Sequence, residues 1–190
     1  MILGLVSINN VPVIKNKELN KTISFTISTT TYINHIDVLF LQNDFLAFKE
    51  ALAFKESQGK YTVTNTLGYL GKYQFGSTTL ERFKIYNTVD FLANPELQEK
   101  AFVALCSVNK WILRKDIKRF SGKIINGIKI TESGIIAAAH LSGAGNVKKF
   151  LRSYGAVNLR DAYGSSIQYY MKRFAGYNLS DISANRKASV

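Results

Sequence analysis

DFLAFKEALAFKESQGKYTVTNTLGYLGKYQFG, residues 44–76, is the stretch that decides the fold of this chain. At helical spacing, Phe45, Phe48 and Leu52 fall on one apolar stripe over residues 44–57. The next i+4 step along that stripe is Glu56, so the pattern predicts an amphipathic helix that ends on an acid. Ser57 and Gly59 follow and end the predicted helix.

A carboxyl group at the end of an apolar stripe has two interpretations. In the first, the stripe simply runs out into water at Glu56. In the second, the carboxyl is held against hydrophobic surface, which disfavours the charged form of an acid and produces a general acid. Helix geometry alone leaves both open.

The segment after the helix, residues 65–76, has three glycines and three aromatic residues in twelve positions. Its glycines allow tight turns and a close approach of a ligand to the backbone. Tyr69, Tyr73 and Phe75 offer flat apolar faces, and Gln74 offers both a donor and an acceptor. This composition suits a polyhydroxylated ligand that carries amides, such as an amino sugar. It equally suits a β-hairpin whose aromatic side chains fill a core.

Two blocks of the chain carry a family resemblance. Residues 56–75, which begin with Glu-Ser and contain Gly68, Gly71 and Gln74, resemble the catalytic block of the lysozyme-like lytic transglycosylases and goose-type lysozymes. AAHLSGAG, residues 138–145, resembles the Ala-Ala-Tyr-Asn-Ala-Gly-x-Gly block of the same superfamily. The order of the blocks also agrees, and the similarity covers roughly residues 43 to 177. The chain departs from the family pattern at Lys72-Tyr73, His140 and Leu141.

The resemblance implies a mainly α (α+β) lysozyme-like domain that cleaves the MurNAc-GlcNAc β-1,4 bond of peptidoglycan. It implies Glu56 as the catalytic acid and needs no cofactor and no metal ion. The substrate-binding residues that it implies come from both blocks: Ser57, Tyr69, Gly71, Tyr73, Gln74, Phe75, His140, Ser142 and Gly143. A neutral imidazole at His140 could take over the hydrogen bond that the family's Tyr makes near the acid.

The reaction outcome depends on a second carboxylate, which glycoside hydrolases use and lytic transglycosylases do not. No acid lies between Glu56 and Glu81, or between Glu132 and Asp161, which favours a lytic transglycosylase. A muramidase stays open, because acids such as Glu81, Asp90, Asp116 or Glu132 could fold back into the site. A non-catalytic glycan-binding module of a secretion or phage apparatus is a further alternative.

The composition is that of a compact globular protein, with 46% hydrophobic and 12% aromatic residues in 190. The net charge of +12 predicts an anionic partner. The densest basic cluster is Lys110, Arg114, Lys115, Lys118 and Arg119, and no nucleic-acid-binding motif accompanies it. Peptidoglycan, whose peptides carry carboxylates, fits this charge. A secretion apparatus or an inhibitor protein would be a further partner.

The chain offers little for disulfide, thiol or zinc chemistry. Cys106 is the only cysteine and lies in an apolar run, so we expect a buried side chain. His35 and His140 are the only histidines. Residues 1–6 lack the features of a secretory signal, and no run has transmembrane length. Action in the periplasm or cell envelope, or in a target cell, would therefore need another export route.

We expect the chain to divide into a β appendage over residues 1–42, a lysozyme-like domain over 43–178 and a polar, frayed tail over 179–190. Within the domain, we expect a short helix from Ser77 or Thr78 to about Ile85 and a long one from Asn94-Pro95 to Leu113. A short extended piece follows within residues 124–130. A further helix starts at Thr131 and is broken at Ser142-Gly143, and a last helix covers residues 161–177.

Overall fold

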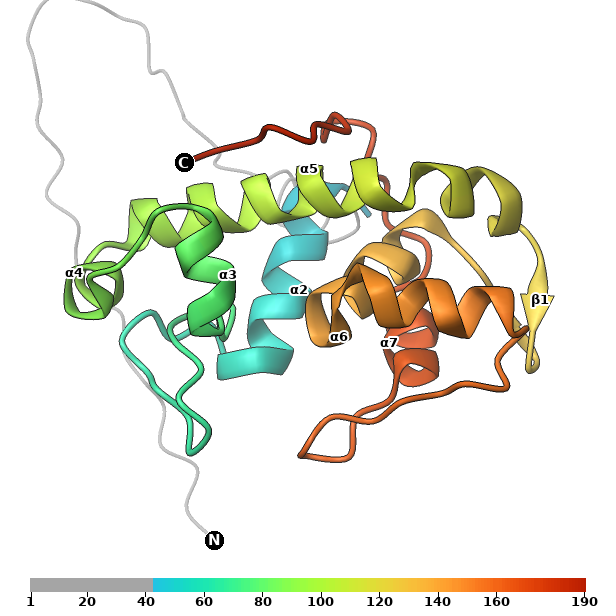
Figure 1. The fold of residues 1–190 in the computed structure, drawn as a ribbon, viewed down its shortest axis with the longest axis horizontal. Coiled ribbons are helices and arrows are strands. Elements are labelled where there is room, and N and C mark those ends of the chain that lie inside the picture. Colours follow the sequence, from blue (N-terminus) through green and yellow to red (C-terminus); the bar gives the residue numbers. More distant parts are fainter. Residues whose placement is uncertain (1–42) are drawn as a thin grey trace, which may run out of the picture. The chain divides into compact units, whose positions relative to one another are not determined.

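The computed structural model describes residues 43–190, and they are mainly helical (Figure 1). The predicted strands of residues 1–42 lie outside the described residues. The elements, in chain order, are α2 (Phe45–Ser57), α3 (Ser77–Arg82), α4 (Thr88–Ala93), α5 (Pro95–Phe120), β1 (Ile124–Ile125), β2 (Ile128–Lys129), α6 (Glu132–Arg152) and α7 (Ile167–Arg173).

Helix α2 forms as the sequence predicts. Its N-cap is Asp44, whose carboxylate accepts the backbone N–H of Ala47 at 2.8 Å. Phe48 and Leu52 are fully buried, so the predicted apolar stripe faces the core. The helix ends at Ser57 because the next residue, Gln58, adopts a left-handed conformation with φ 58°. The last turn of α2 therefore carries Glu56 out of the core.

Helix α5 is the longest element, and it runs the length of the described region in Figure 1. Asn94 caps it by accepting the N–H of Leu97 at 3.0 Å, and Pro95 occupies the first turn, as predicted. The helix continues to Phe120, seven residues beyond the predicted end at Leu113. The additional turns are buried on the side that faces the core. Phe120 packs in the core, and the buried Asp116 carboxylate is paired with the Arg152 guanidinium at 3.0 Å.

Strands β1 and β2 form the predicted extended piece, an antiparallel hairpin in which Ile125 pairs with Ile128. Its two turn residues, Asn126 and Gly127, have φ values of 48° and 74°. A two-residue turn with two positive φ values matches the twist of a hairpin, which is why Asn-Gly is found here.

Helix α6 begins at the predicted cap, Thr131, whose hydroxyl accepts the N–H of Gly134 at 3.1 Å. Gly134 lets α6 approach α7 closely, since a Cβ there would lie 2.5 Å from the Met171 carbonyl oxygen. The predicted break appears as a kink at Gly143, with φ 77° and ψ 152°. Such backbone angles are essentially restricted to glycine.

Helices α3, α4 and α7 differ from the predictions. Helix α4 was not expected, although Asn87 caps it by accepting the N–H groups of Val89 and Asp90. Helix α3 is preceded by Gly76 rather than by a Ser77 or Thr78 cap, and it ends at Arg82. The last helix covers Ile167–Arg173 rather than residues 161–177, because residues 158–166 form a loop and Phe174 is the C-cap.

The C-terminal residues are packed against the domain, so the prediction of a frayed tail is wrong. Leu179 and Ile182 are buried, and the Asn185 N–H donates to the Ser107 carbonyl at 3.1 Å. The Lys110 ammonium also donates to the Leu179 carbonyl at 2.8 Å. The tail therefore runs beside α5 (Figure 1) and belongs to the same packed unit.

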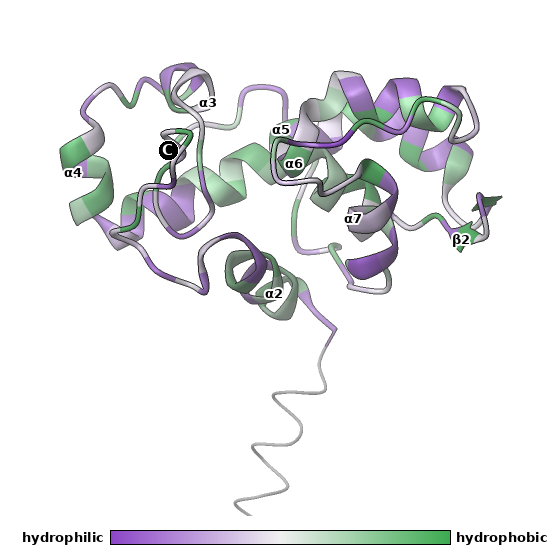
Figure 2. Ribbon diagram, turned by 90° about the horizontal axis from the view of Figure 1, so that it is seen from below, coloured by the Kyte–Doolittle hydropathy of each residue, from purple (hydrophilic) through white to green (hydrophobic). Residues whose placement is uncertain are grey.

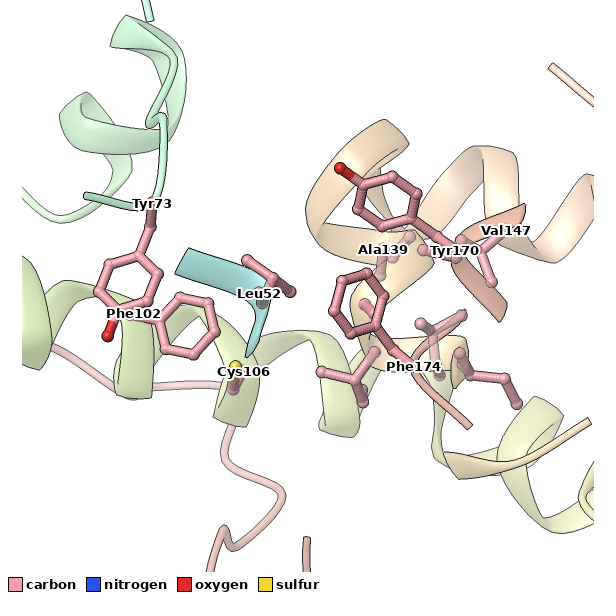
Figure 3. Packing of buried hydrophobic residues seen from close by; sticks show 14 of the residues in the cluster. Leu52, Tyr73, Phe102, Cys106, Ala139, Val147, Tyr170 and Phe174 are labelled. Carbon is pink, nitrogen blue, oxygen red and sulfur yellow. The ribbon is translucent and has the colours of Figure 1, made fainter. Parts of the chain in front are cut away.

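The core joins α2, α5, α6 and α7. Each of these helices carries both hydrophobic and hydrophilic residues (Figure 2). Its densest aromatic contact is the stack of Tyr73 on Phe102, with ring centroids 4.0 Å apart (Figure 3). Cys106 lies in this core as predicted, and burial raises the pKa of its thiol. None of the helices described here is long and apolar enough to cross a membrane.

Candidate functional site

Glu56 lies in the last turn of α2 and is half-buried. Its Oε1 atom accepts a hydrogen bond of 2.6 Å from the hydroxyl of Tyr170. Tyr170 comes from α7, and its side chain is buried against Phe174 in the core (Figure 3). A residue 114 positions further along the chain thus holds one carboxyl oxygen of Glu56.

The Tyr170 hydroxyl stays a proton donor under all ordinary conditions. Burial raises the pKa of Tyr170 well above its usual range, and the neighbouring Glu56 carboxylate raises it further. Because a phenol that keeps its proton donates to a carboxylate, Tyr170 holds Glu56 in one orientation. Tyr170 falls within the predicted last helix, and no local sequence signal marked it as a partner of an acid.

Glu56 lines a cavity of about 730 Å³, which we call the acid cavity. The walls come from the end of α2, the segment of residues 64–74, the middle of α6 and the loop of residues 159–165. Four of the predicted substrate-binding residues line it: Tyr69, Gln74, His140 and Ser142. These residues are far apart in the sequence, and the fold brings them to the catalytic candidate.

A second cavity, also of about 730 Å³, adjoins the acid cavity, and we call it the side cavity. Two further predicted residues, Phe75 and Gly143, line it. The two cavities share part of their lining: Leu67, Tyr69, Gln74, His140, Leu141 and Ser142.

Three predicted substrate-binding residues line neither cavity. The Ser57 hydroxyl donates to the Lys72 carbonyl at 2.7 Å, so it fastens the end of α2 to the neighbouring segment rather than orienting Glu56. Gly71 has φ 72°, and a Cβ there would clash with the Gln98 side chain. The Tyr73 ring is fully buried. These three residues make internal contacts that support the segment lining the cavities.

His140 does not take the place of a hydrogen-bonding partner of the acid. Its Nε2 atom donates to the Tyr73 carbonyl at 2.7 Å, because a carbonyl can only accept. Its Nδ1 atom is buried and has no hydrogen-bond partner among the described residues. His140 therefore holds the backbone beside Gln74, and Tyr170 supplies the hydrogen bond to the acid.

An ionic cluster centred on Glu99 of α5 contacts the segment of residues 61–73. The Glu99 carboxylate accepts hydrogen bonds of 2.6 to 2.8 Å from four side chains: Lys49, Lys72, Tyr61 and Tyr73. Burial alone would raise the pKa of Glu99, but these four donors overcome it and lower that pKa to about 2. The cluster ties the segment of residues 61–73 to α2 and α5.

The loop of residues 159–165 brings a second acid, Asp161, into the lining of the acid cavity. Its Oδ1 atom accepts the N–H groups of Tyr163 at 3.0 Å and Ser165 at 2.7 Å. The acids that the sequence suggested lie elsewhere: Glu132 is paired with Lys110, Asp116 with Arg152, and neither Glu81 nor Asp90 lines this cavity. Sequence reasoning missed Asp161 because its segment was assigned to a helix.

Known proteins add nothing to this geometry: no family model, no curated protein and no solved structure matches the chain. Among residues 43–190, no group of three or more His, Cys, Asp or Glu side chains is placed to hold a metal ion.

If Glu56 is the catalytic acid that the family resemblance implies, Tyr170→Phe is expected to lower kcat about tenfold on peptidoglycan fragments and to leave KM nearly unchanged. The variant keeps the buried ring but removes the 2.6 Å hydrogen bond that orients Glu56. Tyr169→Phe is the matched control, since it removes a hydroxyl from the adjacent, exposed position on α7. An equal loss in both variants would assign the effect to the helix rather than to the contact with Glu56.

Proposed function

We propose that this protein is a peptidoglycan lytic transglycosylase with a lysozyme-like fold, in which Glu56 is the only catalytic acid. The observation that carries the proposal is a half-buried carboxyl that lines a cavity of about 730 Å³ and is held by the phenol of Tyr170. The family resemblance of both sequence blocks supports it, since residues from both blocks line that cavity.

In the proposed reaction, Glu56 donates its proton to the oxygen of the MurNAc-GlcNAc bond as that bond breaks. The resemblance implies that the N-acetyl group of the substrate assists at the anomeric carbon. The Glu56 carboxylate then accepts a proton from the 6-hydroxyl of the same sugar, whose oxygen closes a 1,6-anhydro ring. One residue thus serves first as acid and then as base.

The walls of the acid cavity suit sugars that carry N-acetyl groups. Tyr69 offers an aromatic face with 43% of its surface exposed. The Gln74 amide is fixed by donating to the Gly71 carbonyl at 2.8 Å, and its oxygen has no partner among the described residues. The half-buried Ser142 side chain lines the same cavity from α6. These groups would orient the sugars against Glu56.

Asp161 favours one alternative, a hydrolytic muramidase, because it places a second carboxyl in the lining of the same cavity. A hydrolase would use it to activate water or to stabilise the sugar cation. Its Oδ1 atom is already engaged by two backbone N–H groups, which suits a role in shaping the loop instead. The products distinguish the two reactions.

Digestion of purified sacculi is expected to yield 1,6-anhydromuramic ends, with wild-type protein and with Asp161→Asn alike. Asn keeps the acceptor for both N–H groups and removes only the charge, so the loop stays folded. Mass spectrometry of the released fragments is the measurement. Reducing ends, together with loss of activity in Asp161→Asn, would identify a muramidase. Binding to sacculi without any release would identify a non-catalytic glycan-binding module.

A further inference from the structure

The side cavity differs from the acid cavity in its charges. Arg82 of α3 and Lys148 of α6 line the side cavity, and no acidic residue does. In the acid cavity, by contrast, two cations accompany Glu56 and Asp161, and the charges of the lining balance. A positive potential is therefore concentrated on one side of the proposed glycan site.

The side chains of Arg82 and Lys148 have no ionic or hydrogen-bond partner within the described residues. Arg82 is exposed and Lys148 half-buried, and neither side chain makes an ion pair or hydrogen bond with any residue of the described part of the chain. Lys72, by contrast, is held by Glu50 at 2.7 Å and Glu99 at 2.8 Å. Arg82 and Lys148 are thus free to bind an anion from outside.

We propose that the side cavity binds the carboxylates of the peptide stems that peptidoglycan carries on its muramic sugars. The inference rests on the proposed function, which places the glycan strand in the acid cavity. The two cavities share Tyr69, Gln74 and His140, so a stem that leaves a bound sugar reaches the side cavity directly. Arg82 and Lys148 pair with its carboxylates, while the apolar side chain of Ile112 contacts its uncharged part.

The experiment compares three substrates: intact sacculi, sacculi whose carboxyl groups have been amidated, and glycan strands stripped of peptides by an amidase. The test protein is the double variant Arg82→Gln/Lys148→Gln. The matched control is Lys129→Gln/Lys172→Gln, which removes the same charge from exposed positions that line neither cavity and lie outside the basic cluster of residues 110–119. Cleavage rates are measured by fragment release, and binding is measured by co-sedimentation in the Glu56→Gln background.

The test variant is expected to bind and cleave intact sacculi about fivefold less well than the control and to match it on amidated and stripped substrates. The difference from the control should shrink as salt is added, because exposed charges are screened. Equal behaviour of the two variants on intact sacculi would overturn the proposal, as would an equal loss on stripped strands. Failure of the proposed function is distinct: wild-type protein would then release fragments from none of the three substrates.

Discussion

Glu56→Gln is expected to abolish the release of fragments from sacculi under the proposed function, with a loss of at least about 100-fold, which is the least that a general acid contributes. The substitution keeps the volume of the side chain and can still accept the hydrogen bond from Tyr170, but it removes the proton that the glycosidic oxygen needs. Turbidity loss of a sacculus suspension, followed beside the wild-type protein, is the measurement.

Glu81→Gln is the control for this variant, because Glu81 is an exposed acid on α3 that lines neither cavity. It should retain the wild-type rate, and both variants should unfold at the wild-type temperature. Wild-type activity in Glu56→Gln would remove Glu56 from the mechanism and leave the acid cavity without a catalytic acid.

Glu99→Gln is expected to lower the free energy of unfolding by about 3 kcal/mol, near the lower end for breaking a buried ion pair. The variant leaves the Lys72 side chain, which is only 6% exposed, with one carboxylate instead of two. Glu96→Gln is the matched control on the same helix, because its ion pair with Lys100 is exposed to solvent and should contribute far less to stability. Urea unfolding measures both. Equal effects would show that burial adds nothing to the cluster.

The same cluster predicts how stability depends on pH. Folding lowers the pKa of Glu99 from 4.5 to about 2, so its contribution is fully present above pH 4.5 and is lost as the pH falls towards 2. Urea midpoints of the wild-type protein should therefore fall over this range, and those of Glu99→Gln should fall less. Parallel curves would remove Glu99 as the source of the acid sensitivity.

The sequence predicts the elements whose signals are local. The starts of α5 at Asn94 and of α6 at Thr131 are each decided by a capping side chain within a few residues. The end of α5 and the course of the tail depend instead on distant partners, such as Arg152 for Asp116 and Ser107 for Asn185. Such partners become visible only in the fold.

The candidate site divides in the same way. The position of Glu56 follows from the period of α2, and Tyr69, Gln74, His140 and Ser142 are among the residues that line its cavity. A composition rich in aromatics could not tell which rings face a ligand, and two of the three, Tyr73 and Phe75, are buried. The segment therefore lines the cavity with some of its residues and fills the core with others, and its binding of a sugar stays a prediction.

The contact between Thr66 and Tyr163 bears on how a long polymer reaches Glu56. The two hydroxyls are 2.8 Å apart and join the segment after α2 to the loop before α7, both of which line the acid cavity. A strand threaded from its end could pass with this clasp intact, whereas a strand laid in sideways requires the clasp to part. A single exposed hydrogen bond is worth only about 1 kcal/mol. For the proposed enzyme, parting this contact would therefore cost little, and cleavage within glycan chains as well as at their ends would be expected.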